Sequence, residues 1–143
     1  QYLAMHSPVL NATFFGKFAE NCKKEVEIKE VEYEEFLNLL LVFFPEPVAI
    51  SDATILPITK LADRFQIKGV LSAAENHLIS ANKFSTVEKL QFADKYRFNK
   101  LRDTCLGRFR NVQELKIFKD SKLFDDFSDQ LKGMICKRMI QLL

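Results

Sequence analysis

Apolar side chains along this chain recur mostly at the spacing of α-helices. They lie three and four positions apart in six segments: residues 33–44, 54–65, 68–80, 85–96, 99–110 and 128–143. That spacing gathers apolar side chains on one face of a helix, which then packs against a neighbouring element. The sequence therefore predicts a mostly helical protein whose helices share a core.

One segment has the period of a strand instead. Val26 and Ile28 alternate with Glu25, Glu27 and Lys29, so apolar side chains fall on one face and charged side chains on the other. The predicted fold class is therefore α+β, mostly α, with a small sheet that includes this strand.

Capping chemistry predicts where several helices begin. Ser7 precedes Pro8, and proline tolerates the first helical position because its missing N–H has no partner there anyway. Ser85 and Glu88 have the spacing of a capping box, in which each side chain accepts a hydrogen bond from a backbone N–H. Asn111 is placed to cap a short helix that follows it.

The helix expected over residues 33–44 is unusually apolar. The residues expected on one side of it are Phe36, Leu37, Leu40, Leu41 and Phe44. A helix side of this composition is expected to be buried rather than exposed to water.

Two stretches of the chain are near copies of each other. Residues 61–67 (LADRFQI) and residues 92–98 (FADKYRF) match, and the helical spacing continues after each of them. A repeat of this length is typical of a helical hairpin that was built twice. Helical hairpins stacked side by side usually form surfaces that bind other proteins, so the repeat favours a binding role over catalysis.

Composition and charge limit the partners. The 143 residues carry 21 Lys and Arg against 19 Asp and Glu, a net charge of +2, so no overall field attracts nucleic acid or an anionic membrane. No apolar run approaches the roughly 18 residues that a membrane span needs. The three cysteines, Cys22, Cys105 and Cys136, form no C-x-x-C pair. We expect buried free thiols, and therefore a protein of the cytoplasm or nucleus.

No group of residues has the pattern of a catalytic, cofactor or metal site. His6 and Ser7 are adjacent, but no glycine-rich turn accompanies them to build an oxyanion site. His77 has no His or Cys three or four residues away, so we expect it to be packed or solvated. Asp63 and Asp94 lie a whole hairpin apart, and each is expected to form hydrogen bonds or caps within its own hairpin.

A cluster of cations lies in the second copy of the repeat: Lys95, Arg97, Lys100, Arg102, Arg108 and Arg110. Aromatic residues between them sit at core positions of the repeat, and acidic residues are mixed into the same stretch. We interpret the cluster as the solvated face of a packed hairpin rather than a nucleic-acid surface. Salt-dependent binding of DNA by the chain would reverse this interpretation.

Several segments together resemble BTB/POZ domains. Residues 3–10 (LAMHSPVL) followed by Phe14 resemble the L-A-x-H-S stretch of that family, and the later segments agree in order: residues 25–28, 36–40, 44–45, 61–65 and 74–78. The resemblance covers about residues 2–80 and implies a partial BTB/POZ domain over residues 1–81. The chain has no initiator methionine, and we expect a fragment whose first strands are absent.

The second copy of the repeat resembles the helical extension that follows the BTB domain in cullin adaptors. The resemblance implies a BACK-like extension over residues 82–143, and it is strongest to nematode proteins that join MATH and BTB domains. Such proteins form homodimers and dock the N-terminal domain of cullin-3, while a separate module recruits a substrate for ubiquitin transfer. A missing N-terminal strand would weaken the homodimer.

The resemblance implies a non-enzymatic adaptor of a cullin-3 RING ubiquitin ligase, which needs no cofactor. The alternative is a BTB homo-oligomerisation module of a structural or transcriptional regulator that recruits no cullin. The helical second copy favours the adaptor, because that extension adds contact area.

The resemblance also implies residues for cullin docking. Cullin-binding members have a hydrophobic-x-Glu triplet after the first helix of this segment, and Phe18 and Glu20 occupy those positions. An exposed Phe fills an apolar groove on a partner, and a carboxylate fixes the approach. Phe15 and Phe44 are expected to add to the same surface. The alternatives are that Phe18 packs on Phe14 or Phe15 inside the core, and that Phe44 caps the core.

Overall fold

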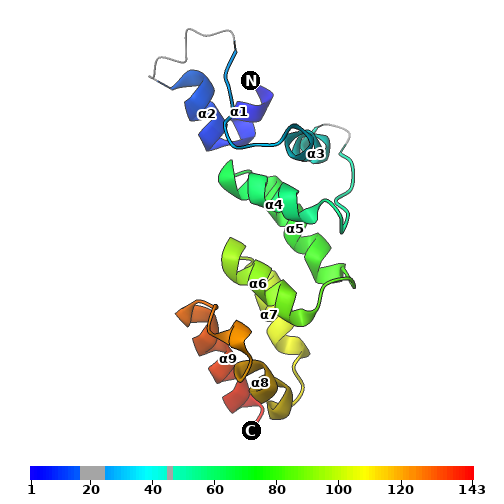
Figure 1. Ribbon diagram of the computed structural model, residues 1–143, viewed down its shortest axis with the longest axis vertical. Helices are drawn as coiled ribbons and strands as arrows, with labels where there is room; N and C mark the ends of the chain where they lie inside the picture. The colour runs from blue at the N-terminus through cyan, green and yellow to red at the C-terminus, as the bar shows by residue number, and fades with distance from the viewer. Residues whose placement is uncertain (17–24, 45–46) are drawn as a thin grey trace. The chain divides into compact units, whose positions relative to one another are not determined.

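The computed structural model describes residues 1–16, 25–44 and 47–143, and helices are the regular elements of these ranges (Figure 1). Their bounds are α1 Tyr2–His6, α2 Pro8–Phe15, α3 Tyr33–Phe43, α4 Ile55–Arg64, α5 Lys68–Ser80, α6 Thr86–Tyr96, α7 Asn99–Arg108, α8 Val112–Lys119, the short 3-10 helix η2 Lys122–Phe124, and α9 Asp129–Gln141. The prediction of a mostly helical fold is confirmed.

The predicted small sheet is wrong for the described part of the chain. Residues 25–28 have irregular backbone structure, although Ile28 is partly buried and packs against the core as the alternation predicted. A strand needs a neighbouring strand to receive its backbone hydrogen bonds, and no described segment provides one. Instead, the Arg64 guanidinium donates hydrogen bonds to the carbonyl oxygens of Lys29, at 2.8 Å, and Glu30, at 3.1 Å.

The chain divides into two compact units, Gln1–His77 and Leu78–Leu143, and α5 has residues in both. A core cluster in the first unit joins residues of α2, α3, α4 and the start of α5: Leu10, Leu39, Ile58, Leu61, Ala62, Phe65, Ile67 and Val70. Full burial of one large aliphatic side chain contributes roughly 1.5–3 kcal/mol. This cluster therefore accounts for much of the stability of the unit.

The repeat forms two helical hairpins, α4–α5 and α6–α7, as predicted. After each first helix comes a residue with left-handed backbone, Gln66 with φ 54° and Arg97 with φ 58°. The next residue in each copy, Ile67 or Phe98, donates its N–H to the carbonyl oxygen five positions earlier, at 2.9 Å both times, and is itself buried. This is the Schellman arrangement, which satisfies carbonyl groups at a helix end.

Each hairpin is tied to another helix through a serine. The hydroxyl of Ser7, the N-cap of α2, donates to the carbonyl oxygen of Phe65 at the end of α4. In the second unit Ser128, the N-cap of α9, donates its N–H (2.8 Å) and its hydroxyl to the carboxylate of Asp94 on α6. The prediction that Asp94 stays within its own hairpin is therefore wrong, while Asp63 lies exposed on α4.

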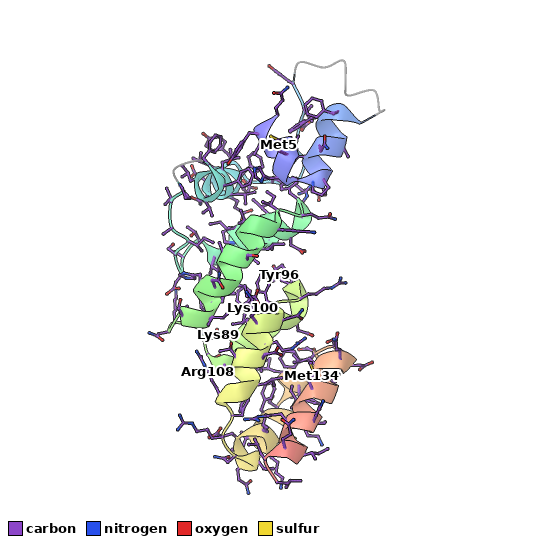
Figure 2. The ribbon with its side chains drawn as sticks, turned by 180° about the vertical axis from the view of Figure 1, so that it is seen from behind. Met5, Lys89, Tyr96, Lys100, Arg108 and Met134 are labelled. Carbon is purple, nitrogen blue, oxygen red and sulfur yellow. The ribbon has the colours of Figure 1, made fainter. Side chains whose placement is uncertain are left out.

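Two cations hold the C-terminal end of α5. Nζ of Lys89, a residue with only 1% of its surface exposed, donates to the carbonyl oxygen of Ala81 at 2.5 Å. The Arg108 guanidinium donates to the carbonyl oxygen of Ile79 at 3.2 Å. Figure 2 labels both cations, which come from α6 and α7. The last carbonyl groups of a helix lack partners within it and carry partial negative charge, so donors of this kind stabilise the end.

The prediction of buried thiols is confirmed for Cys105 and wrong for Cys136, which is exposed, while Cys22 lies outside the described residues. Cys136 follows Ile135, which is fully buried on α9, and a helix turns by about 100° per residue, so the next side chain points outward. Burial raises the pKa of the Cys105 thiol, against a smaller opposite effect of Arg108 and Lys89. Cys105 therefore behaves as a packed apolar side chain.

Candidate protein-docking site

The predicted docking residues are only partly within the described structure. Phe18 and Glu20 lie outside the described residues. Phe15 is the last residue of α2 and is 59% exposed, with its ring edge against Phe14 at a centroid distance of 6.5 Å. Phe14 is partly buried and packs against the core cluster. The end of α2 thus holds one phenylalanine in the core and presents the next one to solvent.

Phe44 follows α3 as its C-cap and is 48% exposed. Its ring stacks on Tyr2 at a centroid distance of 5.9 Å, whereas the preceding residue, Phe43, packs against the core cluster. Of the two alternatives for Phe44, the structure therefore favours a surface position.

Four aromatic side chains from α1 and the end of α3 form a group that we call the aromatic cluster: Tyr2, His6, Phe43 and Phe44. Tyr2 lies between the other three, with ring centroids 5.0 Å from His6 and 5.2 Å from Phe43. Its hydroxyl donates to the carbonyl oxygen of Phe43 at 3.2 Å. Tilted aromatic pairs at these distances stabilise beyond their buried area, so the cluster fixes the end of α3 against α1.

Sequence reasoning found Phe44 in this cluster but missed Tyr2, His6 and Phe43. Tyr2 and His6 are four residues apart, which places them on one face of a helix. This spacing in the sequence is enough to predict that their rings are neighbours. The sequence suggested no packing role for His6, whose ring lies edge-on against Phe43 at a centroid distance of 5.0 Å. The hydroxyl of Ser7 accepts the Leu10 N–H and donates to Phe65. Both residues thus have structural roles.

The side of α3 that was expected to be buried is partly exposed. Phe36, Leu39 and Val42 face the core cluster, while Leu41 and Phe44 are exposed, so the predicted side is wrong for these two residues. Nearly every residue from 36 to 44 is apolar, and the spacing therefore could not choose a side. We call the exposed residues on the far side, Tyr33, Leu41 and Phe44, the α3 outer stripe.

His77 and Asp52 are partners in the structure. Nε2 of His77 lies 2.7 Å from Oδ1 of Asp52, so His77 is held by an ion pair or hydrogen bond rather than simply packed or solvated. Within the described residues, no three His, Cys, Asp or Glu side chains come together in a way that could hold a metal ion. None of the helices in the described ranges has the length and apolar character needed to cross a membrane.

The family model of the BTB/POZ domain matches residues 1–82. The chain belongs to the BTB/POZ family. The matched region contains the whole aromatic cluster, Phe15 and the α3 outer stripe. A BTB/POZ domain is a protein-interaction module, which agrees with a site made of exposed aromatic side chains.

Relatives of this BTB/POZ chain include nematode proteins that also carry a MATH domain. The chain is 33% identical to BTB and MATH domain-containing protein 38 of Caenorhabditis elegans over 141 residues, which are 99% of this chain and 36% of that protein. It is 30% identical to BTB and MATH domain-containing protein 36 of the same organism over 143 residues, which are 100% of this chain and 45% of that protein. The chain thus spans less than half the length of these relatives.

Proposed function

We propose that this chain is the adaptor part of a cullin-3 RING ubiquitin ligase in the cytoplasm or nucleus and has no catalytic activity of its own. Its BTB/POZ region would dock the N-terminal domain of cullin-3, and residues 82–143 would form a BACK-like helical extension. Substrate recruitment would belong to a MATH or other module, since the related nematode proteins carry both domain types in their names.

The observation that carries the proposal is the exposure of aromatic side chains at two helix ends of the BTB/POZ region. Phe15 ends α2 and Phe44 follows α3, and both present about half of their surface to water. Their neighbours Phe14 and Phe43 pack against the core, so the exposed rings rest on a fixed base. Large aromatic side chains on a rigid base are typical hot spots of protein interfaces.

Pull-down of the cullin-3 N-terminal domain by the whole chain tests the proposal. Phe15→Ser and Phe44→Ser each remove an exposed ring without adding charge, and each is expected to weaken binding by more than about tenfold, the size of a hot-spot loss. Leu56→Ser is the matched control, because Leu56 is 55% exposed on α4 of the same unit. Equal binding by all four proteins would contradict the assignment of both phenylalanines.

Phe18→Asp tests the triplet that the family resemblance implies. We expect it to abolish the pull-down and to leave the circular dichroism spectrum unchanged, because a charge in an apolar groove is costly to desolvate. Retained binding would exclude Phe18 as a docking residue. A changed spectrum would support the alternative that Phe18 packs inside the core.

Self-association is the second candidate function, and the α3 outer stripe favours it. Tyr33 and Leu41 of α3 and its C-cap Phe44 are three exposed apolar or aromatic side chains, and an identical stripe on a second copy would cover them. Light scattering with and without the cullin-3 fragment separates the two functions. A larger particle only when the fragment is added supports the adaptor, and dimers that do not bind the fragment support a homo-oligomerisation module.

A further inference from the structure

A groove made of two hollows lies between α9 and the α6–α7 hairpin in the second unit. Its first part is a hollow of about 570 Å³ whose lining includes Arg97, Asn99 and Arg102 on one side and Ser128, Leu131 and Met134 on the other. Its second part is a hollow of about 300 Å³ lined by Asp103, Leu106 and Gly107 of α7 and by residues of α9 that again include Met134. Met134, labelled in Figure 2, therefore joins the two parts.

The groove combines an apolar floor with a cationic rim. Leu106 and Leu131 are buried, and Met134, which lines both hollows, is partly buried. Five cations line the two hollows: Lys95, Arg97, Arg102, Lys137 and Arg138. A long, positively charged groove of this kind is complementary to a ligand that carries both apolar and negatively charged groups.

The acidic residues of the groove are already engaged. The carboxylate of Asp94 accepts hydrogen bonds from Ser128, and that of Asp103 pairs with the Arg102 guanidinium at 2.9 Å. By contrast, Lys137 and Arg97 are exposed, and Nε of Arg138 is buried without an acceptor among the described residues. Another nitrogen of the same guanidinium, Nη2, donates to the carbonyl oxygen of Phe109 at 3.3 Å. The exposed cations are therefore the ones that can meet an anionic ligand.

We propose that this groove binds an acidic peptide segment of a partner protein, with an apolar side chain over Met134 and carboxylates toward the cations. The groove follows α7 from Asn99 to Gly107, about 12 Å at the rise of a helix, which matches about four residues of extended chain. The proposal does not depend on cullin docking, because the docking residues belong to the first unit.

The aromatic residues of the same stretch argue against nucleic acid as the ligand. Binding of single-stranded nucleic acid relies on exposed aromatic rings on which bases stack. Phe98 is buried, Tyr96 packs between Phe92 and Phe98 at centroid distances of 6.1 and 5.8 Å, and Phe109 stacks on Phe118. None of them lines the two hollows.

Fluorescence anisotropy with the whole chain tests the proposal. The probe is a labelled peptide of sequence Glu-Glu-Leu-Glu-Glu, and the comparison peptides replace its Leu by Gly or its Glu residues by Lys. We expect the first to bind, the Gly peptide to bind more weakly and the Lys peptide not to bind. Binding is expected to weaken as salt concentration rises, because the attraction is partly electrostatic.

Two variants with the same change of charge locate the site. Arg97→Glu reverses a cation of the groove and is expected to weaken binding of the acidic peptide about tenfold. Lys100→Glu makes the same change of charge at a residue of α7, labelled in Figure 2, that lines neither hollow, and it is expected to change binding much less. Arg97 has an exposed side chain, so its reversal leaves the packing of the unit in place.

Three results would overturn the proposal. The first is the absence of peptide binding at low salt. The second is an equal loss in Arg97→Glu and Lys100→Glu, which would assign the attraction to overall charge. The third is binding of a single-stranded oligonucleotide in preference to the acidic peptide, with loss in Arg97→Glu, which would assign the groove to nucleic acid.

Discussion

The two copies of the repeated hairpin, α4–α5 and α6–α7, share a backbone and differ in what their side chains do. Thr54 and Ser85 are the N-caps at equivalent positions, and Gln66 and Arg97 are the equivalent left-handed residues. Ile58 of the first copy, however, is part of an apolar core, whereas the equivalent residue of the second copy is Lys89, which is equally buried. The two copies of the repeat therefore have the same backbone path, but the side chains that fill their interiors differ.

The buried pair Ile58 and Lys89 offers the strongest test of that difference. Ile58→Lys places a charged group in an apolar cluster and is expected to lower the free energy of unfolding by about 4 kcal/mol or more. Lys89→Ile keeps most of the volume but leaves the carbonyl group of Ala81 without that donor, at a cost of about 1–2 kcal/mol. Urea denaturation followed by circular dichroism measures both. Equal losses in the free energy of unfolding would mean that the surroundings of the two buried side chains are equally apolar.

The aspartates of the two copies give a second contrast. Asp94→Ala removes the acceptor of two hydrogen bonds from Ser128 and is expected to lower the free energy of unfolding by about 1–2 kcal/mol, because the acceptor is charged. Asp63→Ala is the control in the first copy, where the side chain is exposed on α4, and is expected to change it by less than about 0.5 kcal/mol. Thermal unfolding measures the stability of both variants. Similar losses of stability would contradict a stabilising role for the hydrogen bonds between Asp94 and Ser128.

Substitutions to glycine in the turn that both copies share are expected to stabilise the protein. Gln66→Gly and Arg97→Gly each relieve a side chain from left-handed backbone, and each is expected to raise the free energy of unfolding by about 0.5–1 kcal/mol. Because the two turns have the same geometry, the two gains should be similar. Chemical denaturation measures them, and a loss at either position would show that its side chain stabilises the turn by other contacts.

The smallest expected effect concerns pH. The carboxylate of Glu88 accepts the Ser85 N–H at 2.7 Å, and this hydrogen bond lowers the pKa of Glu88 below its ordinary value. Since the folded-state pKa is depressed, the stabilisation is complete above the unfolded-state pKa and is lost as pH falls through the folded-state pKa. The first copy has Pro57 at the equivalent position. Glu88→Gln should therefore lower the melting temperature at neutral pH but not in acid. A difference in melting temperature that stays the same at all pH values would show that the Glu88 charge is not its cause.

Helix caps were predictable from the sequence, whereas contacts between separate helices were not. Ser7, Ser85, Asn111 and Ser128 all cap helices through their side chains, because a cap needs only residues within one turn. The burial of Lys89 depends on a carbonyl group eight residues away at the end of another helix, and no periodicity reveals such a partner.

The candidate site was predictable to a similar extent. Phe15 and Phe44 came from a family resemblance, and the exposure of Phe44 depends on which side of α3 meets the core. A nearly all-apolar run such as residues 36–44 leaves that choice to packing. Residues 25–28 show the same limit, because alternation predicts a strand only when a second strand is present to pair with it.

The two cations at the end of α5 bear on where this protein should be cut for separate expression. The family model ends at residue 82, but the donors that hold the carbonyl groups of Ile79 and Ala81 are Lys89 and Arg108. A fragment that stops at the family boundary keeps the sequence of α5 and loses both donors, so its last turn should fray. A fragment that keeps both donors must extend at least through α7, and the end of the family model lies inside the second compact unit, Leu78–Leu143.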